Sequence, residues 1–202
     1  HNANSAADAL SARIPDALLV ATELEHTHGL SLWLINEDYP QQLLTPAQVE
    51  DLMNDPPYWA FCWASGWVLA QVFTERPSTV LNQVVVDFGC GSGVAGIAAL
   101  KSGARHVCFC DSDPHALEIT KRNLQLNDLD LGKCSFAQSY EHIEEHLFKS
   151  NDTLILVADV FYDRENLSFL QQFLLDFKRV MVADSRLKGQ ALAGLSIVEN
   201  RQ

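Results

Sequence analysis

Short apolar runs alternate with amphipathic stretches from Leu81 to about residue 183. The apolar runs predict strands at 82–88, 106–111, 133–138, 153–160 and 179–183, and the stretches between them predict helices at 93–102, 114–127, 141–148 and 165–178. Such alternation favours an α/β fold, with a doubly wound, mostly parallel sheet that carries helices on both faces. A short helix at 187–194 and a strand-like run at 195–199 would follow.

The first part of the chain has a different pattern. Residues 1–20 are Ala-rich and helical in pattern, whereas residues 21–36 alternate loosely and are typical of a small hairpin. Thr45 followed by Pro46 predicts a helix over 45–53, because Thr caps a helix and Pro suits its first turn. An aromatic segment then enters a helix that ends near residue 75. We expect one compact domain, in which an N-terminal extension and lid segment (1–78) packs on a ligand-binding core (79–202).

Composition narrows the class of protein. The chain has 202 residues, of which 48% are hydrophobic and 20% charged, so it can bury a full α/β core. Its formal net charge of −12 argues against a nucleic-acid partner. The excess of acidic side chains would attract a basic partner, or would serve only solubility.

The cysteines and the hydropathy of the chain indicate its cellular compartment and whether it binds a metal. Five cysteines, mostly within apolar runs, predict buried free thiols, which suit a reducing cytoplasm. Cys108 and Cys110 have no second pair at zinc-ligand spacing, so we expect no metal site. Because there is no apolar run near membrane-spanning length and no signal-peptide pattern, we expect a cytoplasmic protein with no membrane partner.

The densest motif, Asp87-Phe88-Gly89-Cys90-Gly91-Ser92-Gly93, follows the first strand of the predicted core and leads into an Ala-rich helix. Its glycines would let the backbone pass close to a ligand, and the helix N-terminus would present amide N–H groups. The glycines alone also fit a dinucleotide site. Asp87 favours a different ligand, because a carboxylate repels a pyrophosphate but suits a ligand with positive charge and hydroxyl groups, such as S-adenosylmethionine.

A second acid lies about 20 residues further on, at the end of the next predicted strand. Asp111 is placed where a carboxylate can accept hydrogen bonds from both hydroxyls of a ribose, in NAD as well as in S-adenosylmethionine. The alternative role for Asp111 is a helix cap. Asp113, which directly precedes Pro114, fills that role better.

Two further groups point to a ligand site. Asp159 and Tyr162 follow the predicted strand 153–160, where reactive groups collect in a doubly wound sheet. A carboxylate there could hold a cationic amine and help to deprotonate it, although a turn Asp and a core Tyr would give the same pattern. Trp59 and Trp63 lie four residues apart, and they form either core or a lid whose indole attracts a sulfonium or ammonium group.

Together these motifs resemble the class I, seven-β-strand S-adenosylmethionine-dependent methyltransferases. A closer resemblance, from about residue 24 to about residue 190, is to the electron-transfer flavoprotein β-subunit lysine methyltransferases, and more distantly to the ribosomal-protein methyltransferases. The segments that carry it are Pro57-Tyr58-Trp59-Ala60-x-x-Trp63, Val86-Asp87-Phe88-Gly89-x-Gly91-Ser92-Gly93, Asp111-Ser112-Asp113-Pro114 and Asp159-Val160-Phe161-Tyr162-Asp163.

The resemblance implies methyl transfer from S-adenosylmethionine to a nitrogen, with a lysine of a basic protein as the expected acceptor. The electron-transfer flavoprotein β subunit and a ribosomal protein are candidate partners. Asp159 and Tyr162 would position the amine. The implied cofactor-binding residues are Trp63, Asp87, Phe88, Gly89, Gly91, Gly93, Asp111, Ser112 and Tyr140.

The chain departs from the family pattern in two places. Many relatives carry an acid and a Trp after the third strand of the sheet, where this chain has Gln138-Ser139-Tyr140, so Tyr140 would replace the Trp by stacking. The family fold ends with an antiparallel seventh strand. We expect this chain to lack that strand, to borrow it from the N-terminal segment, or to have lost it with a C-terminal piece.

Three other functions fit parts of the same pattern. They are a small-molecule N-methyltransferase, an NAD-dependent oxidoreductase, and a non-catalytic domain that binds the cofactor and a partner. Asp87 speaks against the oxidoreductase. A protein substrate would need a more open site than a small molecule does.

Overall fold

The computed structural model describes residues 5–39, 44–144, 147, 153–161, 166–185 and 196. The helix expected at 187–194 lies outside them, as does all of the run 195–199 except residue 196. Within the described part, the predicted α/β fold with a parallel sheet is confirmed. No helix in that part is both long and apolar enough to cross a membrane.

Five parallel strands form the main sheet, in the spatial order β5-β4-β3-β6-β7. The centre of the sheet is β3, where Val86 pairs with Cys108 on one side and Ile155 on the other. The order changes direction beside β3, and ligands bind at such a switch point, beyond the carboxyl ends of the strands. The strands are β3 (Val84–Phe88), β4 (His106–Cys110), β5 (Cys134–Ala137), β6 (Thr153–Ala158) and β7 (Arg179–Ala183).

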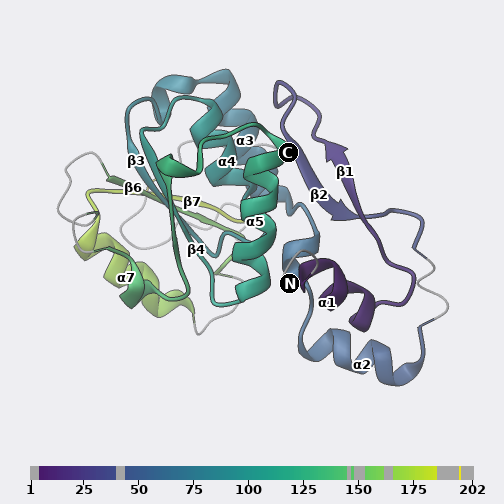
Figure 1. Ribbon diagram of the computed structural model, residues 1–202. Coiled ribbons are helices and arrows are strands. Elements are labelled where there is room, and N and C mark those ends of the chain that lie inside the picture. The colour runs from purple at the N-terminus through teal and green to yellow at the C-terminus, as the bar shows by residue number, and fades with distance from the viewer. Residues whose placement is uncertain are drawn as a thin grey trace.

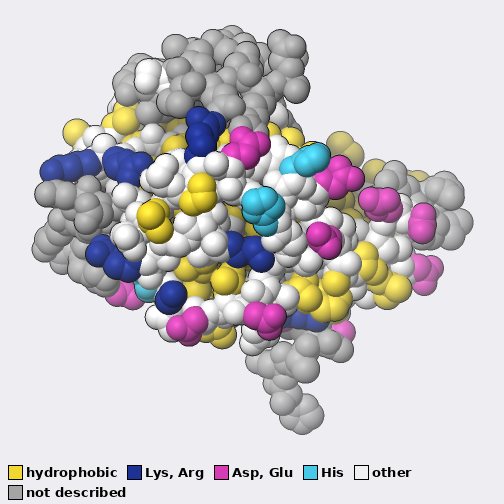
Figure 2. All heavy atoms as spheres, turned by 90° about the horizontal axis from the view of Figure 1, so that it is seen from above, with side chains coloured by type: hydrophobic (Ala, Val, Ile, Leu, Met, Phe, Trp, Pro, Cys, Tyr) yellow, Lys and Arg dark blue, Asp and Glu magenta, His cyan; other side chains and the backbone are white. Residues whose placement is uncertain are grey.

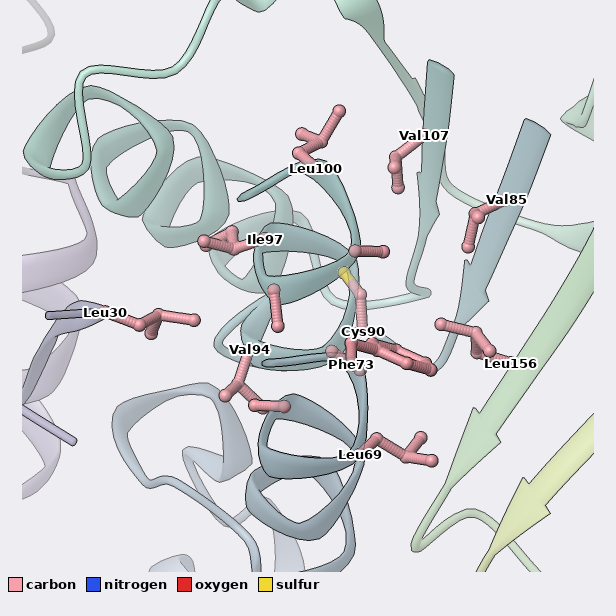
Figure 3. Packing of buried hydrophobic residues seen from close by; sticks show 14 of the residues in the cluster. Leu30, Leu69, Phe73, Val85, Cys90, Val94, Ile97, Leu100, Val107 and Leu156 are labelled. Carbon is pink, nitrogen blue, oxygen red and sulfur yellow. The ribbon is translucent and has the colours of Figure 1, made fainter. Parts of the chain in front are cut away.

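Alternate residues of the strands enter two separate cores. Val85, Val107 and Leu156 face one side of the sheet, which is covered by α3 (Ala64–Glu75), α4 (Val94–Lys101) and α5 (Pro114–Leu126). Figure 3 shows these strand residues and the helix residues that meet them. Val86 and Ile155 face the other side, which is covered by α7 (Leu167–Asp176) (Figure 1). Burial on both faces explains why these strands are continuous apolar runs.

Of the N-terminal elements, one helix and a hairpin pack on the outer face of α5, and a second helix packs on the first. The first helix is α1 (Ser5–Arg13), the second is α2 (Pro46–Asn54), and the antiparallel hairpin consists of β1 (Leu19–Glu23) and β2 (Ser31–Ile35). Leu10 and Ile14 of α1 join Ile35, Trp59 and Ile119 in a third hydrophobic cluster, which attaches the extension to the sheet domain. Figure 1 shows the hairpin beside α5, on the side away from the sheet.

Three predicted elements differ in extent. The helix expected over 1–20 ends at Arg13 in the described part, because a turn at Asp16, with φ of 64°, redirects the chain into β1. Leu19 then pairs with Ile35, so the hairpin begins before residue 21. Within the range of the helix expected over 141–148, a short 3₁₀ turn covers Tyr140–His142 and Leu147 is in an α-helical conformation, while residues 145–146 and 148 lie outside the described residues.

Local signals explain the helix starts. Thr45 and Gln48 form a capping box at α2, and the Asp113 side chain accepts a hydrogen bond from the His115 amide at the start of α5. The short helices at the remaining turns are η2 (Tyr58–Ala60), η3 (Pro77–Thr79) and η4 (Leu131–Lys133).

Charge is unevenly spread over the surface. In the view of Figure 2, most Lys and Arg side chains lie to the left, whereas most Asp and Glu side chains lie to the right, on the side of the N-terminal hairpin. On this face, the acidic side chains therefore gather toward the hairpin. All five cysteines are free thiols, and Cys90, Cys108 and Cys110 are buried.

Candidate active site

A cleft of about 720 Å³ lies at the carboxyl ends of the strands. It is bounded by Phe88 of β3, Cys110 of β4 and Ala158 of β6, and by the segment that precedes α3. Eight of the residues predicted from the sequence line it: Trp63, Phe88, Gly89, Gly91, Asp111, Ser112, Tyr140 and Asp159. Asp87 and Gly93 do not line the cleft, and Tyr162 lies outside the described residues, so its role stays a prediction.

The glycine-rich loop between β3 and α4 forms the floor of the cleft. Gly91 has a φ of 53°, and a Cβ there would meet no atom within 4 Å, so the backbone is exposed to a ligand at this point. Gly93 has a φ of 80°, but a Cβ there would lie 2.7 Å from Thr120 of α5. The loop is thus open on the cleft side and supported closely from behind.

Asp111 ties the end of β4 to this loop. Its Oδ2 accepts a hydrogen bond from the Gly91 amide at 2.8 Å, and its Oδ1 accepts one from the Asp113 amide at 3.0 Å. Burial raises the pKa of this carboxyl, while the two backbone N–H groups act in the opposite direction. A carboxylate has about four lone-pair sites, so Asp111 can still accept hydrogen bonds from the hydroxyl groups of a ligand.

Asp87 lies beneath the loop rather than in the cleft wall. The residue is 2% exposed, and its Oδ2 accepts a hydrogen bond from the Gly96 amide of α4 at 2.9 Å. Burial, together with a smaller effect of the charge of Asp111, raises the pKa of Asp87 to about 7, while the hydrogen bond from the Gly96 amide acts in the opposite direction. Asp87 therefore acts on the cleft through its charge and through the position of α4. Its predicted role as a cofactor-binding residue remains a prediction.

Asp159 connects three elements at the edge of the cleft. Its Oδ2 accepts a hydrogen bond from the Ser65 amide at 2.9 Å, and its Oδ1 accepts one from the Ser65 hydroxyl at 2.5 Å. Oδ1 also accepts hydrogen bonds from the amide and the hydroxyl of Ser185, at 3.2 and 3.0 Å. The carboxylate thereby links the end of β6 to the first turn of α3 and to the residue that follows β7, and its orientation is fixed.

The backbone of Asp159 adopts an uncommon conformation. Its φ is 49°, in the left-handed region that residues other than Gly seldom occupy, although Asp and Asn tolerate it best. Such conformations persist where the surrounding contacts impose them, and they cluster at functional sites. Here the hydrogen bonds with the two serines supply those contacts.

An aromatic lip borders the cleft where the chain enters α3. Trp63 is 40% exposed, and its indole Nε1 donates a hydrogen bond to the Tyr58 carbonyl at 2.9 Å. The Tyr58 ring meets the Trp63 ring edge-on, with 5.6 Å between the centroids. Trp59 has a different environment, because it is 1% exposed and stacks on His115 at 5.9 Å. Of the two tryptophans that the sequence offered as a lid, Trp63 is the one at the mouth, whereas Trp59 packs in the core.

Tyr140 belongs to a cluster of aromatic rings on the opposite wall. Its ring lies 5.3 Å from that of Phe173 and 6.3 Å from that of Phe88, measured between centroids. The hydroxyl donates a hydrogen bond to Asp176 of α7, and burial together with Asp176 raises the pKa of this phenol. The hydrogen bond fixes the position of the ring, so Tyr140 offers the cleft a flat apolar surface.

Sequence reasoning missed several residues of the site. Ser65 and Ser185 hold Asp159, and Thr120 and Asn123 hold the glycine-rich loop from behind. Thr120 and Asn123 did leave a signal, because they are polar residues at helical spacing from Ala116 and Ile119, on the apolar face of an amphipathic helix, and the structure buries both of them. A buried polar side chain requires a hydrogen-bond partner, and here the partner is the loop.

The residues present fit S-adenosylmethionine. The open backbone at Gly91 can approach a ligand closely, Asp111 has acceptor capacity for ribose hydroxyls, and Tyr140 offers a surface on which a base can stack. The carboxylates nearby suit a ligand with positive charge. Among the described residues, no group of three or more His, Cys, Asp and Glu side chains is arranged to hold a metal ion.

A parallel sheet in this order, with a glycine-rich loop after its central strand and acids at the ends of β3, β4 and β6, defines a class I S-adenosylmethionine-dependent methyltransferase fold. The model of the ribosomal protein L11 methyltransferase (PrmA) family matches residues 74–164. An electron transfer flavoprotein beta subunit lysine methyltransferase homolog from Caenorhabditis elegans is 31% identical over 173 residues, which cover 78% of this chain and 69% of that protein. The chain belongs to the electron transfer flavoprotein beta subunit lysine methyltransferase family, as the sequence motifs predicted.

Two other proteins match a smaller part of this chain. The electron transfer flavoprotein beta subunit lysine methyltransferase of Danio rerio is 36% identical over 121 residues, which cover 58% of this chain. The chain spans only 44% of the length of that relative. A putative RNA methyltransferase of known structure from Pyrococcus horikoshii aligns with a TM-score of 0.48 and 20% identity, covering 63% of each chain.

Proposed function

We propose that this protein transfers a methyl group from S-adenosylmethionine to the side-chain amine of a lysine in a basic protein. The observation that carries the proposal is the charge of the cleft. Every charged side chain among its described lining residues is an acid, namely Asp55, Asp111, Asp113, Glu141 and Asp159. Arg13 forms an ion pair with Asp55, so the other four acids provide the attraction for a cation.

On the cofactor side, residues of this chain bind and orient S-adenosylmethionine. Asp111 accepts hydrogen bonds from the ribose hydroxyls while it holds the Gly91 amide, and Trp63 covers the ligand from the lip of the cleft. An indole face attracts positive charge, which favours a sulfonium over a neutral thioether. When bound, S-adenosylmethionine supplies a methyl group on a sulfonium that is already a good leaving group.

On the acceptor side, Asp159 binds the amine. A lysine amine has an ordinary pKa near 10.4 and must lose a proton before it can attack. The fixed carboxylate accepts a hydrogen bond from the ammonium group and orients it, and the proton then passes to water in the open cleft. Tyr162, which follows Asp159 in the motif, is proposed as the second residue at the amine.

The relatives support a protein acceptor over a small molecule. Their names specify the electron transfer flavoprotein beta subunit and ribosomal protein L11, both of which are proteins, and we propose these two as candidate substrates. Membership of a methyltransferase family argues against an NAD-dependent oxidoreductase. We also propose a cytoplasmic location, which five unpaired thiols support.

The test is transfer of labelled methyl groups by the purified protein. The acceptors are the purified electron transfer flavoprotein beta subunit, purified ribosomal protein L11, and the protein and small-molecule fractions of an extract from cells that lack this protein. We expect label in protein, on lysine by mass spectrometry. Label only in the small-molecule fraction would favour the alternative N-methyltransferase, and no label in any fraction would favour a non-catalytic cofactor-binding domain.

Asp159→Asn is the matching variant, because Asn tolerates the left-handed backbone while the charge is removed. We expect methyl transfer to fall roughly 100-fold or more, while the affinity for S-adenosylhomocysteine stays within about threefold. Asp128→Asn is the control, since Asp128 is exposed, also has a positive φ of 54°, and does not line the cleft. Equal loss of cofactor binding and of transfer in Asp159→Asn would make Asp159 a cofactor residue instead.

A further inference from the structure

Three polar residues on one face of α5 and its C-cap join the glycine-rich loop to the N-terminal hairpin. Thr120, Asn123 and Asn127 are spaced by three and four residues, so they lie in a row along the helix. Thr120 donates a hydrogen bond to the Gly91 carbonyl at 3.3 Å. Asn127 lies at the hairpin end of the row, where its side chain pairs with both the amide and the carbonyl of Ser31 at 3.0 and 2.6 Å. Its Nδ2 also donates a hydrogen bond to the Asn123 carbonyl at 2.7 Å, but within the described part of the chain no hydrogen bond joins its side chain to the glycine-rich loop.

Asn123 is the member of the row that contacts both sides. Its Oδ1 accepts a hydrogen bond from the Trp33 amide of β2 at 2.7 Å, and its Nδ2 donates one to the Ser92 carbonyl of the loop at 2.8 Å. A backbone amide can only donate and a carbonyl can only accept, so these partners allow a single orientation of the side-chain amide. The residue is 0% exposed, which means that water cannot replace either partner.

The loop has little freedom apart from this contact. The Gly91 amide donates a hydrogen bond to Asp111, and the Gly93 amide donates one to the Cys90 carbonyl at 2.7 Å. The Ser92 carbonyl lies between these two fixed points, and Asn123 holds it. The geometry of the loop at the cleft floor therefore depends on Asn123, the side chain that also accepts a hydrogen bond from β2.

We propose that Asn123 is a positioning residue that couples docking of the hairpin β1–β2 to the shape of the cofactor loop. With Trp33 in place, Oδ1 of Asn123 is occupied and Nδ2 is directed at Ser92. Without the hairpin, the amide loses the partner that sets its orientation. The inference rests on the proposed function in one respect, since it takes the loop to bind S-adenosylmethionine and its product.

The test compares Asn123→Ala, within α5, with Asn127→Ala, at the C-cap of the same helix. Each substitution removes two hydrogen bonds to backbone groups of other elements, and Asn127→Ala also removes the one to the Asn123 carbonyl. The affinity for S-adenosylhomocysteine is measured by calorimetry at a temperature where both variants are folded by circular dichroism. We expect roughly tenfold weaker binding for Asn123→Ala and a change within about twofold for Asn127→Ala. Equal losses in the two variants, or none in either, would overturn the inference and leave the proposed function intact.

A second measurement does not depend on the ligand. Amide hydrogen exchange of the free protein should be faster in both the loop 91–93 and β2 for Asn123→Ala, and faster only in β2 for Asn127→Ala. An unchanged loop in Asn123→Ala would contradict the coupling. If the unaltered protein bound no S-adenosylhomocysteine, the proposed function would fail, and the exchange data alone would decide the role of Asn123.

Discussion

The carboxylate of Asp111 accepts a hydrogen bond from the amide of Gly91 at 2.8 Å, so the acid at the end of β4 and the loop that follows β3 form one unit. The acid that the sequence assigns to a ribose therefore also sets the position of the cleft floor. A change at Asp111 alters two parts of the cofactor site together.

Asp111→Asn should weaken binding of S-adenosylhomocysteine by roughly tenfold or more. Both oxygens of Asp111 accept hydrogen bonds from backbone N–H groups, and an Asn would turn an NH₂ group toward one of them. Calorimetry of the folded variant measures the effect. Asp130→Asn is the control. Asp130 also accepts a hydrogen bond from a glycine amide, that of Gly132, at 2.8 Å, but Asp130 does not line the cleft. Equal affinities of the two variants would argue against the assignment of Asp111.

Ser65→Ala should slow methyl transfer by roughly tenfold without a comparable effect on cofactor affinity. Ser65 donates two hydrogen bonds to Asp159, and the substitution removes the one from its hydroxyl. The carboxylate would keep its charge but lose part of its orientation, which is the property that a group positioning the amine needs. Single-turnover rates report the loss. An unchanged rate would mean that the Ser65 amide and Ser185 suffice to orient Asp159.

Trp63→Leu should weaken the binding of S-adenosylmethionine more than the binding of its product, S-adenosylhomocysteine. S-adenosylmethionine carries a positive sulfonium and S-adenosylhomocysteine does not, so loss of the indole face should cost the cofactor more. Cation–π attraction is worth about 0.5–2 kcal/mol, which predicts a change of roughly threefold to thirtyfold in the ratio of the two affinities. Competition binding at constant temperature measures the ratio. If both ligands weaken equally, Trp63 acts only as an apolar cover.

The repeated pattern of strand and helix made the sheet and the position of the cleft predictable from the sequence. Apolar runs buried on both faces can be recognised one at a time, and the acid at the end of each run marks the sheet edge where ligands bind. Asp111 and Asp159 were found in this way, and both line the cleft. The family resemblance then selected the cofactor over NAD.

The contacts that hold these acids could not be predicted in the same way. Asp159 is oriented by Ser65 and Ser185, which are 94 and 26 residues away in the chain, and a single sequence carries no sign of such pairs. Asp87 was expected in the cleft because it ends a strand. Alternation along β3 instead directs its side chain to α4, where it meets the Gly96 amide. The face of the sheet on which a side chain lies depends on the register of the strand, and a motif at the end of a strand does not indicate that register.

Asp87→Asn should stabilise the fold at neutral and alkaline pH, and the gain should depend on pH. The pKa of Asp87 rises from 3.8 to about 7 on burial, so the folded state binds a proton that the unfolded chain has already lost. The free energy of unfolding of the unaltered protein must therefore fall as pH rises from about 4 to about 7. An Asn at this position can still accept the hydrogen bond from the Gly96 amide but does not ionise, so the variant does not lose stability over this range through residue 87. Above pH 7 the variant should be more stable by roughly 2–4 kcal/mol, and the difference should shrink toward pH 5.

Urea denaturation of both proteins at several pH values between about 5 and 8 measures this difference. Because the pKa of Asp111 is also raised, some dependence on pH should remain in Asp87→Asn, and the double variant with Asp111→Asn should be flatter still. A stability difference that is constant across the range would contradict a buried, proton-binding Asp87. The same variant should bind S-adenosylmethionine less tightly at pH 8, since the negative charge beneath the loop favours a cationic ligand. A gain in stability together with a loss of cofactor affinity would show that this carboxylate is retained for function at a cost to folding.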